Sequence, residues 1–190
     1  MKEIKNTNEI TKIINDEWEK HEKEHRQNFL LKSLFGIENK YILTKERKFI
    51  RKKVLGAVKN ENEFVTVYRI QAIKDFGDVK KGELGGFVSD EYCISPYGNS
   101  WVYGDAILVS SYIADNVKVR NNSMVVSSFL TDNVVIEEGS KIFNKSVITD
   151  DTKIGGNITV KHSVISGSSR ISGESTIKEE IISNKILFLI

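Results

Sequence analysis

The chain has 190 residues, of which 39% are hydrophobic, and its formal net charge is only +2. Its single cysteine, Cys93, excludes a disulfide framework within the chain and is typical of a reducing compartment. No apolar run reaches the length of a membrane span, and the first ten residues, MKEIKNTNEI, contain no apolar signal region. The sequence therefore predicts a cytoplasmic protein without a membrane partner.

Residues 8–35 are predicted to form one long helix. Asn8 can cap its first turn, and Gly36 is a stop signal. Apolar and aromatic side chains recur at steps of three and four and form a narrow stripe: Ile10, Ile14, Trp18, His21, His25 and Phe29. The remaining helix surface is charged, which indicates an arm that packs on a partner or on its own domain.

The helix contains His21-Glu22-Lys23-Glu24-His25, which matches the H-E-x-x-H motif of zinc proteases. In those enzymes the two histidines bind the metal and the glutamate activates water in a cleft. Here the two positions between Glu22 and His25 are charged, and no third ligand follows in a recognisable signature. We therefore predict no metal and no cofactor, and interpret the motif as a charged, exposed helix face.

A second, short helix is predicted from Lys45 to Leu55, within a strongly basic segment. Residues 40–53 contain seven lysines and arginines and one acidic residue, Glu46. Such an excess can contact phosphates or an acidic protein, although a solvated helix face explains it equally well. The candidate macromolecule-binding residues are Lys45, Arg47, Lys48, Arg51, Lys52 and Lys53.

After a polar turn at residues 59–62, the segment Phe64 to Ile73 alternates and is rich in Val, Tyr and Ile, which predicts a strand. Residues 61–92 are expected to form a β cap on the domain that follows, because an open solenoid end exposes unpaired backbone groups. Residues 1–60 then form a helical, partly basic arm.

Residues 93–190 consist of an internal repeat of about 17 residues. Copies begin at Cys93, Ser110, Ser127, Lys145, His162 and Glu179. Within each copy an aliphatic residue recurs every six positions, as at Ile148, Ile154 and Val160, and a small or β-branched residue stands four positions after most of them. The apolar positions of an amphipathic α-helix recur about every 3.6 residues, and those of a hairpin sheet every two residues. Neither structure fits a spacing of six. The repeat predicts a mainly β fold: a single-stranded left-handed parallel β-helix of about five coils of roughly 17–18 residues. We expect Ile136, Ile148, Ile154, Ile165 and Ile171 to be buried and stacked on their equivalents.

The segment from Tyr68 to Ala106 resembles the entry cap and first coil of a bacterial and phage family of left-handed, hexapeptide-repeat β-helix proteins. The pattern R-I-x-A-x-x-D-F-G-D-V-x-x-G-x-L-G-G-F-V is matched most specifically by DFGDV at 75–79 and LGGFV at 84–88. Members are often labelled transferases on the basis of their fold. The resemblance implies that fold and a phage or prophage origin, and it implies no particular activity.

His162 is the only histidine of the solenoid and the fallback candidate for a catalytic residue. Hexapeptide acyltransferases use a histidine as general base between subunits. However, the equivalent positions in the other copies are Ser110, Ser127, Lys145 and Glu179, which indicates an exposed corner. No long loop interrupts the solenoid to form an acceptor cleft, so we predict no catalytic residue.

Two functions remain open. The first is a non-enzymatic macromolecule-binding protein, phage- or prophage-encoded, that acts in the cytoplasm of a bacterial host through its N-terminal arm. Its partner would be a host protein or a ribonucleoprotein, for example a CRISPR-type nuclease complex that it inhibits, with nucleic acid contacted by the basic helix. The second is an acyl-CoA-dependent acyltransferase. The uninterrupted solenoid, the scarcity of histidine and the segregated basic segment favour the first.

The chain is also expected to form a homodimer through its last strand. The residues concerned are Ile186, Leu187, Phe188, Leu189 and Ile190, an apolar run without charge. Pairing with the same strand of a second copy would satisfy the strand edge and bury the apolar face. Alternatively, the segment folds back under the N-terminal helix of the same chain.

Overall fold

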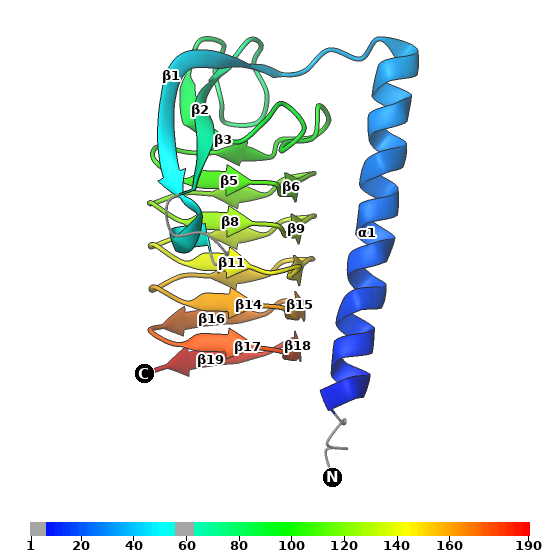
Figure 1. Ribbon diagram of the computed structural model, residues 1–190, viewed down its shortest axis with the longest axis vertical. Coiled ribbons are helices and arrows are strands. Elements are labelled where there is room, and N and C mark those ends of the chain that lie inside the picture. The colour runs from blue at the N-terminus through cyan, green and yellow to red at the C-terminus, as the bar shows by residue number, and fades with distance from the viewer. Residues whose placement is uncertain (1–6, 56–62) are drawn as a thin grey trace.

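The computed structural model describes residues 7–55 and 63–190. The turn predicted at 59–62 and the boundary predicted between residues 60 and 61 lie outside these ranges. One long helix, α1 (Thr7–Phe35), lies beside a solenoid of short, stacked parallel strands (Figure 1). The mainly β solenoid with an N-terminal helix is thus confirmed.

The strands form three sheets, one for each side of the solenoid. Sheet 1 has the order β1 (Tyr41–Arg51), β2 (Phe64–Ala72), β3 (Leu84–Val88), β5 (Ile107–Val109), β8 (Met124–Val126), β11 (Lys141–Phe143), β14 (Thr159–Lys161) and β17 (Thr176–Lys178). Sheet 2 contains β4 (Trp101–Val102), β7 (Lys118–Val119), β10 (Val135–Ile136), β13 (Lys153–Ile154), β16 (Arg170–Gly173) and β19 (Ile186–Leu189). Sheet 3 contains β6 (Tyr112–Ile113), β9 (Phe129–Leu130), β12 (Val147–Ile148), β15 (Val164–Ser166) and β18 (Ile181–Ser183).

The core is a set of aliphatic columns that run down the inside of the solenoid. Ile136 pairs with Ile154, and Ile154 with Ile171, while Ile148 pairs with Ile165 on another side. Each of these side chains is at most 2% exposed. The expected burial and coil-to-coil stacking are therefore confirmed, because equivalent residues of the repeat meet in parallel register.

One corner absorbs the additional residue of the third repeat copy. At the corner between sheets 1 and 3, one residue per coil adopts a positive φ, as do Ser127 (47°) and His162 (47°). In the longer coil two consecutive residues do so, Asn144 (58°) and Lys145 (59°). The insertion is thus confined to the corner, and the flanking strands keep their pairing with the coils on either side.

The first coils are covered by a β-hairpin instead of a helix and a strand. β1 pairs antiparallel with β2, β2 antiparallel with β3, and β3 parallel with β5, so the hairpin extends sheet 1. The helix predicted from Lys45 to Leu55 is wrong: the segment is strand β1 followed by the short 3-10 helix η1 (Lys52–Leu55). The reason is that β2 needs a partner along its outer edge, and residues of β1 alternate between a face packed on the solenoid and a solvent face.

Lys40 is buried at the start of the cap, with no exposed surface. Its ammonium donates to the carbonyl oxygens of Tyr97 (3.2 Å) and Gly98 (3.1 Å) and to Ser100 Oγ (3.2 Å). It also lies 4.7 Å from the centroid of the Phe76 ring. Removal from water lowers the pKa of Lys40 to about 7.

The aliphatic columns predict that truncating two neighbouring residues of one strand destabilises the protein to very different extents. We expect Ile136→Ala in β10 to lower the free energy of unfolding by about 2–5 kcal/mol, because it leaves a cavity between two coils. Val135→Ala, on the outward side of the same strand, is the control and should cost far less. Urea denaturation measures both. Equal losses would contradict the assigned register.

Lys40 predicts a rise of stability with pH. The amine ordinarily titrates at 10.5, so between pH 7 and 10.5 the unfolded chain holds more protons than the folded one, and the free energy of unfolding increases with pH. Relative to Lys40→Met, the native protein should gain up to about 1.4 kcal/mol per pH unit. Urea titrations from about pH 7 to 8.5, below the thiol and phenol titrations, measure this difference. Parallel stability curves for the two proteins would refute it.

Candidate functional site

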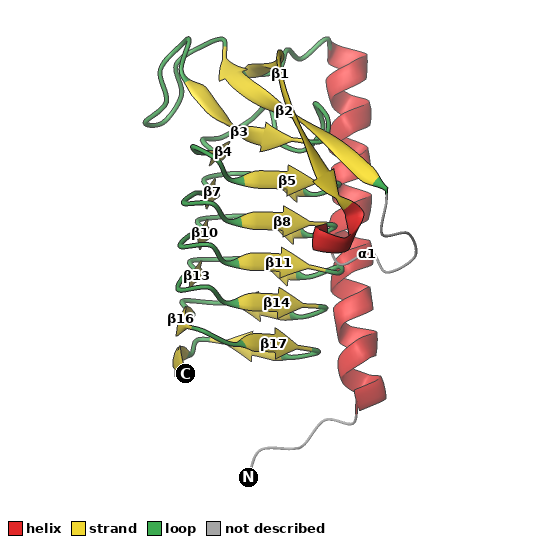
Figure 2. Ribbon diagram, turned by 60° about the vertical axis from the view of Figure 1, so that its left-hand side comes forward, coloured by secondary structure: helices red, strands yellow, loops and turns green. Residues whose placement is uncertain are grey.

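The β1–β2 hairpin has an inner face that fixes it on the solenoid (Figure 2). Leu55 and Val67 are buried there against outward-facing side chains of sheet 1, and the cluster is completed by Phe87, Val109, Val126 and Phe143. Ile50 and Val65 pack on it from the hairpin. The hairpin is therefore a rigid part of the domain, held by apolar burial.

Ion pairs reinforce this inner contact. Lys48 Nζ lies 2.8 Å from Asp105 Oδ1 and 4.0 Å from the centroid of the Phe87 ring. Arg69 lies 3.3 Å from the same carboxylate and 2.9 Å from Glu46. The hydrogen bond and charge of Lys48 hold the pKa of Asp105 below its ordinary value. These cations are already neutralised inside the domain.

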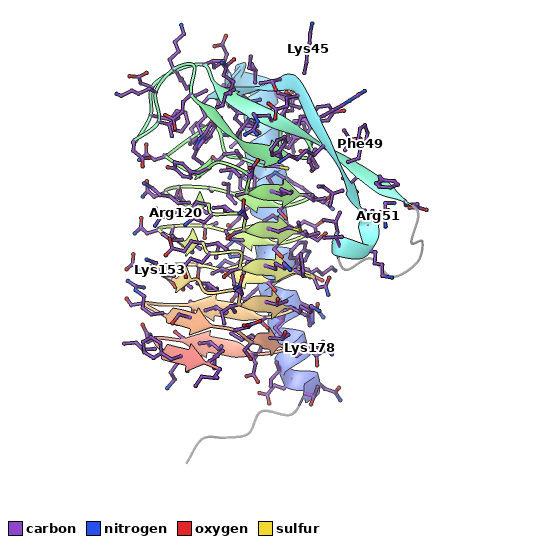
Figure 3. The ribbon with its side chains drawn as sticks, turned by 90° about the vertical axis from the view of Figure 1, so that its left-hand side faces the viewer. Lys45, Phe49, Arg51, Arg120, Lys153 and Lys178 are labelled. Atoms are coloured by element: carbon purple, nitrogen blue, oxygen red, sulfur yellow. The ribbon has the colours of Figure 1, made fainter. Side chains whose placement is uncertain are left out.

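The opposite, outer face of the hairpin consists of Lys45, Arg47, Phe49 and Arg51 from β1 and Phe64, Thr66 and Tyr68 from β2. Arg47 pairs with Tyr68, Phe49 with Thr66, and Arg51 with Phe64 across the two strands. Lys45, Phe49 and Arg51 project away from the solenoid (Figure 3). Backbone alternation therefore presents basic and aromatic side chains on one side of the two-stranded ribbon.

Two arginine–phenylalanine contacts organise this outer face. The Arg47 guanidinium lies 5.4 Å from the centroid of the Phe49 ring, and that of Arg51 lies 5.9 Å from the Phe64 ring. The phenylalanines are 60% and 51% exposed. Within residues 7–55 and 63–190, neither arginine forms an ion pair with a carboxylate. Their charges thus remain available to a ligand.

The six predicted binding residues are divided between different environments. Lys45, Arg47 and Arg51 lie on the outer face, whereas Lys48 points to the solenoid and Lys52 pairs with Glu63. Lys53 is exposed in η1. Sequence reasoning missed Phe64 and Tyr68, which join the same surface only through strand pairing. Residues 45–51 (KERKFIR) show no polar–apolar alternation that could have pointed to it.

Helix α1 packs on sheet 3 along most of its length (Figure 1). Ile14 is fully buried against Val147 and Val164. Farther along, the ring of Trp18 lies 4.5 Å from that of Phe129. The predicted stripe therefore faces the helix's own domain and covers an apolar side of the solenoid.

The two histidines of the H-E-x-x-H motif belong to this helix contact, so the interpretation of the motif as an exposed helix face is wrong for His21 and His25. His25 lies 4.1 Å from the Tyr112 ring, and His21 lies 6.2 Å from the Phe129 ring. Burial lowers the pKa of both imidazoles. In the part of the chain that the structure describes, no group of three His, Cys, Asp or Glu side chains is arranged to hold a metal ion.

His162 occupies a corner between sheets 1 and 3, as its position in the repeat predicted. Its positive φ is shared by the equivalent Ser110, Ser127, Lys145 and Glu179. Its backbone N–H donates to the carbonyl of Phe143 in the preceding coil at 3.2 Å. Cys93 is 1% exposed, and burial raises the pKa of its thiol to about 11, which is typical of a packed thiol and not of a nucleophile.

Residues 186–190 continue the solenoid. β19 pairs parallel with β16 in sheet 2, and Leu187 and Leu189 pack against the core. Ile186 is 69% exposed and Phe188 80%. Because α1 covers sheet 3, the segment does not lie beneath the helix, contrary to the fold-back alternative.

A scan of the sequence against protein-family models finds no match, and a search of curated proteins finds none either. Among the helices of the described residues, none combines the length and the apolar character that a membrane span requires.

The two half-buried histidines predict that α1 loosens in acid. Since their folded-state pKa values lie below the ordinary 6.5, the unfolded chain takes up protons first, and stability falls as the pH drops through 6.5. His21→Gln/His25→Gln should flatten the decline between about pH 7 and 5. Hydrogen exchange of the α1 amides measures this loss of helix stability, and His162→Gln is the control. An unchanged decline in the double variant would refute the assignment.

Proposed function

We propose that this chain is a non-enzymatic macromolecule-binding protein whose contact surface is the outer face of the hairpin. Its ligand is a phosphate backbone, in free nucleic acid or in a ribonucleoprotein. The observation that carries this proposal is the separation of charge on β1. The inward cations are matched by carboxylates, whereas Arg47 and Arg51 have none among the described residues and stand beside exposed aromatic rings.

Charge and geometry both support a polyanion. A guanidinium presents a planar fork of donors that suits phosphate oxygens, and neutralising phosphates releases counterions. Arg47 and Arg51 alternate with the inward Lys48 and Ile50 along one strand, so their side chains lie on the same face, and Lys45 is exposed at the irregularity that precedes them. The hairpin is anchored by a buried apolar cluster, so these cations are held in position before a ligand arrives.

The proposed cellular role is based on the phage or prophage origin that the resemblance of residues 68–106 implies. A protein made during infection would find suitable strands in a host nuclease–guide complex, where occupation of the guide or target strand inhibits the nuclease. The acyltransferase alternative requires a general base beside an acceptor cleft. His162, by contrast, is part of a solenoid corner that repeats in every coil.

The test is charge reversal of the outer face. Lys45→Glu/Arg47→Glu/Arg51→Glu should abolish binding of a fluorescent oligonucleotide of about 20 nucleotides in anisotropy titrations. The slope of log K against log salt should become shallower by about 2 to 3. The melting temperature should barely change, because these side chains lie on the solvent face.

The matched control reverses three exposed lysines on the solvent side of α1, Lys12, Lys20 and Lys23. This variant has the same net charge and should keep most of the affinity. An equal loss of affinity in both variants would mean that binding depends only on net charge. A binding constant that does not change with salt would refute the phosphate contact.

A further inference from the structure

We infer that the outer face of the hairpin is a stacking platform for single-stranded nucleic acid, with unpaired bases on Phe49 and Phe64 and phosphates at the neighbouring arginines. This inference rests on the proposed function and names its ligand class. It starts from an unusual feature of the surface: two large rings are more than half exposed although they belong to regular strands.

Strand pairing fixes the backbone positions of the two phenylalanines relative to each other. Phe49 lies opposite Thr66, and Phe64 lies opposite Arg51, so the phenylalanines are diagonal neighbours on one face of an antiparallel pair. The backbone positions of such neighbours are about 7–8 Å apart, about twice the 3.4 Å rise per nucleotide of a duplex strand. An extended single strand, in which consecutive bases no longer stack on each other, can therefore place one base on each ring.

The arginines complete each stacking position. The Arg47 guanidinium lies over the Phe49 ring and that of Arg51 over the Phe64 ring, at distances that allow cation–π attraction, so a base would stack on the remaining exposed face of each ring. A base on either ring has its phosphate within reach of a guanidinium. Thr66, which lies directly opposite Phe49, has a short side chain. Base–aromatic stacking tolerates any sequence, because every base has a π face.

A duplex fits this surface less well than a single strand. In a duplex the base faces are hidden, so the phenylalanines gain no partner. A free two-stranded ribbon can enter a major groove. Here, however, the inner face of the ribbon is packed on sheet 1, and the solenoid beneath it obstructs such insertion. The exposed rings therefore favour unpaired nucleotides.

The test replaces the rings without changing the charge. Phe49→Leu/Phe64→Leu retains apolar side chains and net charge but removes the π faces. We measure anisotropy with three fluorescent probes of about 20 nucleotides: oligothymidine, the same strand in a duplex, and an abasic strand. The native protein should bind the single strand at least about tenfold more tightly than the other two. The double variant should lose at least about tenfold on the single strand and little on the abasic strand.

Phe188→Leu, on the exposed side of β19, is the matched control and should bind like the native protein. If no probe binds at low salt, or if the protein binds only anionic vesicles or an acidic protein, the proposed function fails. If charge reversal abolishes binding but the duplex binds as tightly as the single strand, only the stacking inference fails. Unchanged affinity of the phenylalanine-to-leucine variant for the single strand would also overturn the stacking inference alone.

Discussion

The structure depends on the stacking of equivalent aliphatic side chains from coil to coil. Each short strand contributes one inward residue, and columns such as Ile136–Ile154–Ile171 are dry and continuous. Because every strand is only two to four residues long within the regular coils, no strand could persist alone, and the backbone pairing follows from the packing of its neighbours. The corner insertion at Asn144 and Lys145 shows the strength of this constraint: an additional residue is placed outside the strands, at positive φ, and the columns remain in register.

The same geometry determines what the N-terminal elements must do. Inward residues fill the core, but outward residues of sheets 1 and 3 are also apolar, as at Phe143 and Phe129. A helix covers one of these sides and a hairpin the other. The N-terminal region is therefore integral to the domain and not a free arm. This leaves the outer face of the hairpin as a surface whose residues are not required by the packing beneath it.

The sequence contained enough information for the core and for α1, since both have a strict period. The six-residue spacing of aliphatic residues identified the buried isoleucines, and spacings of three and four residues identified the stripe from Ile10 to Phe29. The hairpin was misassigned because residues 45–55 are too few to distinguish a helical period from a strand period. Only pairing with the outer edge of β2 makes the segment a strand. Nor could local sequence show which cations are neutralised: Asp105 lies 57 residues from Lys48 and meets it only after the coil closes.

This division of the basic residues explains how one short segment serves two purposes. A strand that alternates sides can place every second cation against carboxylates of the domain and every second cation in solvent. A helix of the same sequence would distribute these charges around its circumference and would not place them on one face with the exposed phenylalanines. The backbone positions of Phe49 and Phe64 are fixed by strand pairing within an anchored hairpin, so little backbone entropy remains to be lost when a base stacks on either ring. The solenoid thus contributes to binding indirectly, as a rigid support for a ribbon whose recognition surface lies entirely on its solvent side.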